Sequence, residues 1–160
     1  MSYSLIIPIY NEEYALKDLL LELETLPDII EVIIINDGST DNSKKILSFQ
    51  KHIKVLHNPI NMGKGFSIIN AIEFVSNQNI ILMDGDLEID IESIPRLIKE
   101  FELNDNHVIV GSRWNEKSNP GKNINTYGNY LINYIFNFLY GTSLTDVLCC
   151  VKIMNKDLFK

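Results

Sequence analysis

Short apolar runs alternate with amphipathic segments along this chain, and this alternation constrains its fold more than any other feature. The apolar runs lie at 3–9, 31–36, 53–57, 80–83 and 108–111. Short apolar runs bounded by polar residues indicate buried strands, and apolar residues spaced three or four apart between them indicate helices. Because strands and helices alternate four times, we expect an α/β fold with three layers, a mostly parallel sheet with helices on both faces.

The helices are predicted between these runs and after the last one. They are expected at about 12–26, 42–49, 66–75, 94–101 and 127–140, followed by a strand-like segment at 145–152. Asn11 is the predicted N-cap of the first helix, with Glu12 and Glu13 favourable in its first turn. A length of 160 residues suits one domain with a sizeable core, so residues 1–160 are expected to form a single domain.

Charge and cysteine content exclude several classes of protein. A net charge of −7 argues against a protein that binds nucleic acid through a broad basic surface. Cys149 and Cys150 are adjacent, which gives neither a disulfide framework nor metal-ligand spacing, so a reducing compartment such as the cytoplasm is expected. No stretch approaches the roughly 18 apolar residues of a membrane span.

Two carboxylates separated by one glycine follow the run at 80–83. Burying a carboxylate is costly unless a cation pairs with it, so Asp84 and Asp86 should lie just past the strand, where open α/β sheets bind ligands. Gly85 has no side chain, so backbone or ligand can come close there. Two hard oxygen ligands suit Mg²⁺ or Mn²⁺, typically shared with substrate phosphates. A solvated acidic turn is the plain alternative.

Polar clusters follow the other predicted strands as well, namely Tyr10-Asn11-Glu12, Asp37-Gly38-Ser39 and Ser112-Arg113. Four such clusters at one edge of a parallel sheet predict a binding crevice. Arg113 is either a bidentate phosphate ligand or a surface arginine. Lys64, at a predicted helix start, is either part of an anion site or a solvated lysine. The glycines match neither a dinucleotide fingerprint nor a Walker A loop.

Four segments together resemble the family 2 glycosyltransferases: Ile-Pro-Ile-Tyr-Asn-Glu-Glu, Ile-Ile-Asn-Asp-Gly-Ser-Thr-Asp, Asn-Met-Gly-Lys-Gly and Met-Asp-Gly-Asp-Leu-Glu. The resemblance runs from about residue 3 to the end of the chain. It is closest to the branch that moves a sugar onto a polyprenyl phosphate, as dolichol-phosphate mannose synthase does. It implies a GT-A fold, a Rossmann-like architecture that binds nucleotide sugars, and a divalent metal with inversion at the anomeric carbon.

The resemblance also implies roles for individual residues on the donor side. Pro8, Tyr10 and Glu12 match the first donor-site segment, in which Asn11 also lies, and Asp37 matches the residue that contacts the nucleotide base or ribose. Asp84, Gly85 and Asp86 match the Asp-x-Asp motif, whose aspartates hold the metal, and Asp86 is the expected catalytic one. Glu88 stands where the branch usually has a glutamine that helps hold the metal. Lys64 and Arg113 complete the predicted nucleotide-sugar site.

The acceptor side rests on fewer residues. Thr145-Asp146 resembles a Thr-Asp near the acceptor site, where Asp146 is the candidate general base if the acceptor is a hydroxyl. Cys149 to Lys152 replaces the usual Gly-Phe-Arg or Gly-Phe-Lys. The aromatic helix at 127–140 is expected to be core, and its Tyr130, Tyr134 and Phe138 could instead lie beside a lipid acceptor. Because family members usually continue further, we expect a truncated or minimal catalytic domain.

The predicted function is therefore a metal-dependent inverting glycosyltransferase that uses a UDP- or GDP-linked sugar and a polyprenyl phosphate at the cytoplasmic face of a membrane. Two alternatives remain: a non-catalytic module that binds nucleotide sugars, and a transferase whose acceptor is a saccharide hydroxyl. A sugar nucleotidyltransferase is disfavoured, because no glycine-rich loop follows the first strand. The sequence predicts no nucleic-acid partner and does not indicate an oligomeric state.

Overall fold

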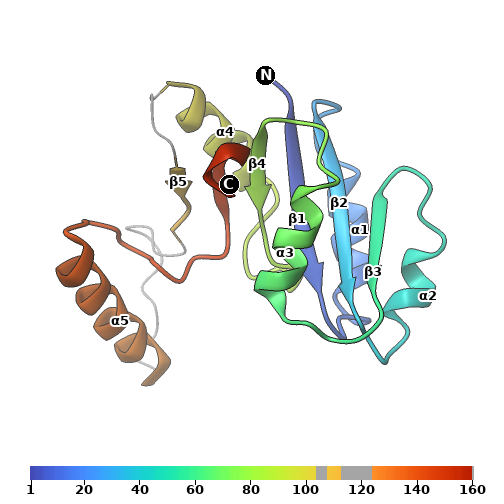
Figure 1. The fold of residues 1–160 in the computed structure, drawn as a ribbon, viewed down its shortest axis with the longest axis horizontal. Coiled ribbons are helices and arrows are strands. Elements are labelled where there is room, and N and C mark those ends of the chain that lie inside the picture. The colour runs from blue at the N-terminus through green and yellow to red at the C-terminus, as the bar shows by residue number, and fades with distance from the viewer. Residues whose placement is uncertain (104–107, 113–123, 160) are drawn as a thin grey trace.

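Six strands form one mixed sheet in the computed structural model, which describes residues 1–103, 108–112 and 124–159. The sheet has the order β3-β2-β1-β4-β6-β5 (Figure 1). The strands are β1 (Tyr3–Ile9), β2 (Ile30–Asp37), β3 (Lys54–Asn58), β4 (Asn79–Leu82), β5 (Val108–Val110) and β6 (Lys152–Asn155). β1 is central and buried along its whole length, as expected for an apolar run that strands cover on both sides.

The first four strands are parallel, whereas β6 runs antiparallel to both β4 and β5. The carboxyl ends of β1, β2, β3 and β4 therefore meet at one edge of the sheet. The loops that follow these strands are the segments in which the polar clusters were predicted. The mostly parallel sheet expected from the sequence is confirmed.

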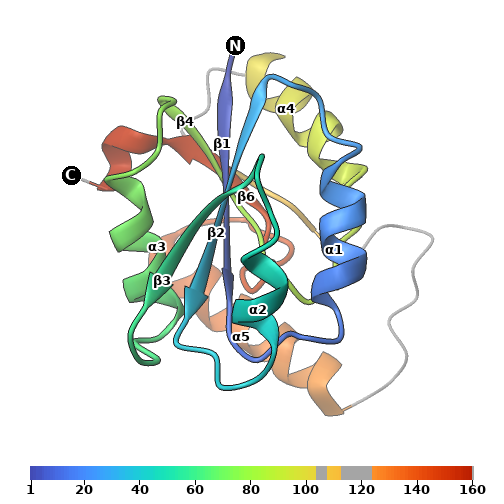
Figure 2. The same ribbon diagram turned by 90° about the vertical axis from the view of Figure 1, so that its right-hand side faces the viewer.

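Helices cover both faces of this sheet. Figure 2 shows α3 on one face and α1 and α4 on the other, which confirms the three layers. The helices are α1 (Leu16–Leu23), α2 (Ser43–Leu47), α3 (Lys64–Ile72), α4 (Ser93–Leu103), α5 (Ile124–Tyr140) and a short 3₁₀ helix, η1 (Lys156–Phe159).

The core is divided by the sheet into two clusters. Side chains alternate between the two faces of a strand. Leu5 and Ile7 of β1 therefore pack on the side of α1 and α4, while Ile6 packs with Ile33 and Ala71 on the side of α3. Because all of these side chains are buried, the strands are fixed in register by apolar contacts on both faces.

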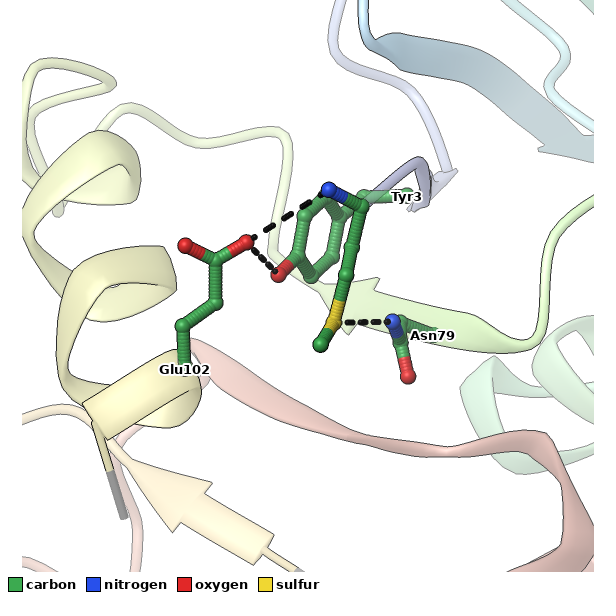
Figure 3. A network of polar contacts seen from close by, with 4 residues as sticks. Tyr3, Asn79 and Glu102 are labelled. Carbon is green, nitrogen blue, oxygen red and sulfur yellow. Dashed lines mark hydrogen bonds and ion pairs between the residues drawn. The ribbon is translucent and has the colours of Figure 1, made fainter.

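A polar contact ties the amino end of β1 to α4 (Figure 3). The hydroxyl of Tyr3, a fully buried residue, donates a 2.9 Å hydrogen bond to Oε1 of Glu102. The amino terminus lies 3.7 Å from the same oxygen, and Asn79 Nδ2 donates to Sδ of Met1 at 3.8 Å. Burial, then the Glu102 carboxylate, raises the pKa of Tyr3 above its usual value. These contacts lie at the end of the sheet opposite the polar loops.

Two local predictions are wrong. Asn11 does not cap α1, which begins at Leu16 after Ala15. Instead, Asn11 adopts a left-handed φ of 57°, which asparagine tolerates, and its Oδ1 accepts a 2.8 Å hydrogen bond from the N–H of Thr40. The strand-like segment predicted at 145–152 is a strand from Lys152 onward only.

α5 stands apart from the layers of the sheet in Figure 1. Three of its aromatic side chains are exposed rather than core: Tyr130 is 50% exposed, Tyr134 69% and Phe138 77%. The expectation that this helix is core is therefore wrong, and the alternative of an outward aromatic face is retained. No helix among the described residues is both long and apolar enough to cross a membrane.

Candidate functional site

A pocket of about 210 Å³ lies at the sheet edge where the carboxyl ends of the parallel strands meet. It is lined by residues from the carboxyl ends of β1 and β2, from the loops after β1, β3 and β4, and from the start of α3: Pro8, Ile9, Tyr10, Glu12, Asp37, Asn61, Gly63, Lys64, Asp84, Gly85 and Asp86. The sequence-predicted residues Pro8, Tyr10, Glu12, Asp37, Lys64, Asp84, Gly85 and Asp86 are thus brought together. Asn11, Glu88 and Asp146 are not among the lining residues, and Arg113 lies outside the described residues.

Backbone-to-side-chain hydrogen bonds interlock the loops after β1 and β2. The N–H of Asn11 donates to Ser39 Oγ at 3.0 Å, and the N–H of Glu12 donates to Ser43 Oγ at 3.2 Å. The N–H of Glu13 donates to Asp41 Oδ2 at 3.0 Å. These bonds satisfy backbone groups that no helix turn satisfies. Asn11 therefore acts by holding the two loops together rather than by lining the pocket.

Asp37 holds the end of β3 and the loop that follows it by hydrogen bonds. It is only 3% exposed. Its Oδ1 accepts hydrogen bonds from Asn58 Nδ2 at 2.7 Å and from the N–H of Met62 at 2.9 Å, and its Oδ2 accepts one from the N–H of Gly63 at 2.8 Å. Burial acts to raise the pKa of Asp37, but Asn58 and the other donors outweigh it and hold this pKa below its usual value. The carboxylate is therefore charged and anchors the segment that leads into Lys64.

Gly38 allows the loop after β3 to pack against the end of β2. Its φ is 69°, a conformation that favours glycine, and a Cβ at this position would lie 2.3 Å from the carbonyl carbon of Ile60. No side chain fits between the two segments. The close contact places the loop of residues 60–63 next to Asp37, where the N–H groups of Met62 and Gly63 reach its carboxylate.

Asp84 and Lys64 form an ion pair across the pocket, between Asp84 Oδ1 and Lys64 Nζ. Asp84 Oδ1 is otherwise buried and makes no hydrogen bond of ordinary geometry, so the contact is a charge pairing. Asp84 follows β4, whose ladder continues through a 3.1 Å hydrogen bond from the N–H of Met83 to the carbonyl oxygen of Ile6. The acidic segment is therefore held by the sheet.

Asp86 lies in a tight turn. Its Oδ1 accepts a 3.0 Å hydrogen bond from the N–H of Glu88, and Leu87 between them has a φ of 58°. A left-handed leucine is strained, and its partly buried side chain packs against the core. The absence of a side chain at Gly85 also leaves room for the core, because a Cβ there would lie 2.6 Å from Ile9 Cγ2. The missing side chain at Gly85 thus makes room for Ile9, and Gly85 also lines the pocket, where a close approach of a ligand stays a prediction.

The pocket is strongly acidic. Burial, followed by the charges of Asp86, Asp41 and Asp84, raises the pKa of Glu12 above its usual value. Among the described residues that line the pocket, Lys64 is the one basic side chain facing Glu12, Asp84 and Asp86. Such a pocket favours a cation and would repel a phosphate that arrived without one.

The donor set fits Mg²⁺ or Mn²⁺ shared with a ligand. Asp84 and Asp86 offer hard carboxylate oxygens, which these ions prefer. Within residues 1–103, 108–112 and 124–159, no three His, Cys, Asp or Glu side chains converge closely enough to hold a metal ion. One or two carboxylates completed by phosphate oxygens and water is the usual arrangement for Mg²⁺. Glu88, an exposed residue, lies outside the pocket lining.

Asp146 lies on a segment that α5 holds in place. Asn133 of α5 donates to the carbonyl oxygen of Thr145 at 2.6 Å and accepts from the N–H of Val147 at 2.8 Å. The backbone of residues 145–147 therefore bonds to a side chain of α5, and β6 begins only at Lys152. Asp146 is only 1% exposed.

Cys150 is a neighbour of the acidic pair that was not predicted from the sequence. The thiol of Cys149, followed by the backbone of Asp84, lowers the pKa of Cys150 below its usual value. Cys149 is fully buried, as expected of a core cysteine. Cys150 reaches Asp84 because β6 pairs antiparallel with β4, with Lys152 opposite Leu82. Only this long-range register brings the two together, so no spacing in the sequence could have indicated it.

The model of the family described as "Glycosyl transferase family 2" matches residues 4–160. Dodecaprenyl-phosphate galacturonate synthase of Rhizobium johnstonii is 28% identical, over 100% of this chain and 49% of its own length. Undecaprenyl-phosphate 4-deoxy-4-formamido-L-arabinose transferase of Photorhabdus laumondii is 31% identical, over 93% of this chain and 47% of its own length. The chain thus spans about half the length of these curated relatives.

Solved structures share the fold. Glucosyl-3-phosphoglycerate synthase of Mycobacterium tuberculosis, in complex with Mn²⁺, UDP-glucose and phosphoglyceric acid, superposes with a TM-score of 0.78 at 17% identity, over 98% of this chain and 57% of that one. A mannosyltransferase of Pyrobaculum calidifontis, in complex with GDP-Man and Mn²⁺, gives a TM-score of 0.60 at 17% identity, over 69% and 35%. The GT-A fold implied by the resemblance is confirmed.

Proposed function

Because the chain belongs to glycosyl transferase family 2, we propose that its acidic pocket binds a nucleotide-diphosphate sugar with Mg²⁺ or Mn²⁺ and that the sugar is transferred to a polyprenyl phosphate. The observation that carries this proposal is the convergence of Asp84, Asp86 and Lys64 with the predicted donor-site residues in one pocket of about 210 Å³. Solved members of the fold in complex with Mn²⁺ and a nucleotide sugar support it.

Each side of the pocket has a part in holding the donor. Asp84 and Asp86 would hold the cation, which when bound offsets the charge that builds on the leaving diphosphate. Lys64 supplies a positive charge at the start of α3, where free N–H groups favour an anion. Asp37 anchors the loop after β3. Lone pairs left on its carboxylate can accept a hydrogen bond from an N–H of the base or from a ribose hydroxyl.

The reaction is a single displacement that inverts the anomeric carbon. A phosphate oxygen of the acceptor attacks the anomeric carbon on the face opposite the leaving group. The new bond to the acceptor oxygen forms as the bond to the β-phosphate oxygen breaks, and the nucleoside diphosphate leaves with the electron pair. The protein's task is to align the two phosphates and to stabilise charge.

The position of Asp146 favours a phosphate acceptor over a hydroxyl. A hydroxyl needs a general base within reach of its proton. Asp146, the candidate base, is 1% exposed and lies outside the pocket lining. A phosphate is already anionic and needs no base. The relatives from Rhizobium johnstonii and Photorhabdus laumondii, whose names specify polyprenyl-phosphate products or acceptors, agree with this choice.

We place the domain at the cytoplasmic face of a membrane, where such an acceptor would be embedded. The exposed aromatic residues of α5 suit that position, because aromatic side chains are favoured at membrane–water interfaces. Asn133 connects this helix to the segment that carries Asp146. The lipid surface and the acceptor segment would then be close together.

A transfer assay tests the proposal. Radiolabelled UDP- and GDP-sugars are offered to a short-chain polyprenyl phosphate in detergent with Mn²⁺, and label is counted in the lipid phase. We expect label in the lipid, its loss with EDTA, and loss of nearly all of it in Asp86→Asn. Asp146→Asn should keep a substantial fraction, whereas loss of a general base would cost about 10²–10⁴-fold. Label that moves only to free saccharides would contradict the lipid acceptor. No transfer, despite cation-dependent nucleotide binding, would favour a binding module.

A further inference from the structure

The ammonium group of Lys64 lies where a divalent cation bound to Asp84 would also lie. Its ammonium group pairs with Asp84 Oδ1, an oxygen of one of the two carboxylates assigned to the cation. A metal ion bound through this oxygen and the ammonium group cannot both lie against it, since two positive charges in contact repel. The ion pair and cation binding are therefore competing states of the same carboxylate.

The backbone of Lys64 is fixed while its charged end can move. Lys64 is the first residue of α3, and Gly63 before it is bound to Asp37 through its N–H at 2.8 Å. The side chain of Lys64 is 52% exposed, whereas that of Asp84 is 28% exposed. A lysine has a flexible stem of four carbons. The ammonium group can thus exchange partners inside the pocket without any change in the loop.

We propose that Lys64 is an exchangeable counter-ion, which neutralises Asp84 in the empty pocket and moves to the diphosphate when donor and cation enter. The cation and the diphosphate of this inference are those of the proposed function, on which it rests. The diphosphate withdraws the ammonium group from Asp84 and thereby frees the oxygen for the metal. The bound cation then raises the affinity for the nucleotide by more than the contact between the two ligands alone would. The bound nucleotide raises the affinity for the cation by the same factor, because such coupling is reciprocal.

The charges of the pocket determine whether loss of the Lys64 ammonium group raises or lowers the affinity for a cation. With Lys64 paired, Asp84 is neutralised and Asp86 and Glu12 remain as the charges offered to a cation. Without the ammonium group, a cation that binds alone meets one more uncompensated carboxylate. A neutral residue at position 64 should therefore bind a cation alone more tightly, while it binds a nucleotide diphosphate more weakly.

The test compares wild type with Lys64→Gln and Lys64→Arg. Free Mn²⁺ is measured by electron paramagnetic resonance during titration of the protein alone, and UDP or GDP binding is measured by calorimetry at saturating Mn²⁺. In Lys64→Gln we expect Mn²⁺ alone to bind roughly 5-fold more tightly or better, the lower end of ordinary coupling between sites. The nucleotide should bind more weakly, and the gain in Mn²⁺ affinity caused by nucleotide should shrink. Lys64→Arg, which keeps the charge, should stay near wild type.

A second lysine controls for the general change in charge. Lys45→Gln removes the same charge from the exposed side of α2, outside the pocket lining, and should leave Mn²⁺ affinity within about twofold. Unchanged or weaker Mn²⁺ binding in Lys64→Gln would overturn the exchange, while the proposed function would stand if nucleotide binding to wild type still needs Mn²⁺. An equal gain in Lys45→Gln would also overturn it. Absence of Mn²⁺ binding in every variant, with nucleotide present, would overturn both.

Discussion

The backbone N–H of Gly63 donates a 2.8 Å hydrogen bond to Oδ2 of Asp37, which joins the end of β2 to the residue just before α3. Asp37→Ala removes this bond, leaves the N–H of Met62 without its acceptor, and leaves Asn58 Nδ2 with Ser67 Oγ as its remaining acceptor. We expect the free energy of unfolding to fall by about 1–3 kcal/mol, and nucleotide affinity to fall because Lys64 is no longer held in place. Urea denaturation and calorimetry measure the two effects. Asp18→Ala, on the first turn of α1, is the control. Stability equal to wild type would refute the anchoring role.

Acid should destabilise the protein through the same carboxylate. Burial acts to raise the pKa of Asp37, but its donors lower it below the ordinary value of 3.8. A folded pKa below the unfolded one gives stability that is fully present above the unfolded pKa and is lost as pH falls through the folded value. Unfolding free energy should therefore decrease as pH drops below about 4. Asp37→Asn, which cannot titrate, should flatten this decrease in denaturation series at several pH values. An unaltered slope would exclude Asp37 as a source.

Two glycines near the pocket should respond in opposite directions to alanine. Gly38→Ala forces a left-handed φ of 69° on a residue with a Cβ and places that Cβ 2.3 Å from Ile60, so we expect a loss of at least about 1 kcal/mol. Gly65→Ala, in the first turn of α3, where the new Cβ has no atom within 4 Å apart from its chain neighbours and the backbone of its own helix, should gain up to about 0.5–1 kcal/mol from helix propensity. Thermal unfolding followed by circular dichroism distinguishes them. A stabilising Gly38→Ala would contradict the close packing of the loop.

The outward face of α5 should matter for lipid binding and not for folding. Phe138 is 77% exposed, so Phe138→Ser should change unfolding free energy by less than about 0.5 kcal/mol. Its co-sedimentation with phospholipid vesicles should decrease, because an aromatic anchor is lost. Phe49→Ser, at a residue that is 71% exposed in the turn after α2, is the matched control and should sediment as wild type does. Equal sedimentation of wild type and both variants would contradict a membrane face on α5.

The sequence predicts the layers and the edge of the sheet on which the site lies, because both follow from local patterns. Apolar runs predict strands, and polar residues after them meet where parallel strands end, so Asp37, Asp84 and Asp86 could be placed in advance. Contacts between distant segments could not be predicted. Asn11 has the features of an N-cap, yet Thr40, far away in the sequence, binds its side chain. The ion pair of Lys64 with Asp84 likewise depends on two loops that only the sheet brings together.

The central claim is that Asp84 and Asp86 hold a cation on which nucleotide-diphosphate binding depends. Calorimetric titration of the protein with UDP and with GDP, first with Mn²⁺ and then with EDTA, tests it directly, with Asp86→Asn measured in parallel. We expect one of the nucleotides to bind with Mn²⁺ and at least about tenfold more weakly with EDTA, since the acidic pocket repels a bare diphosphate. Asp86→Asn should lose most of the Mn²⁺ effect. Equal affinity with Mn²⁺ and with EDTA would contradict the claim.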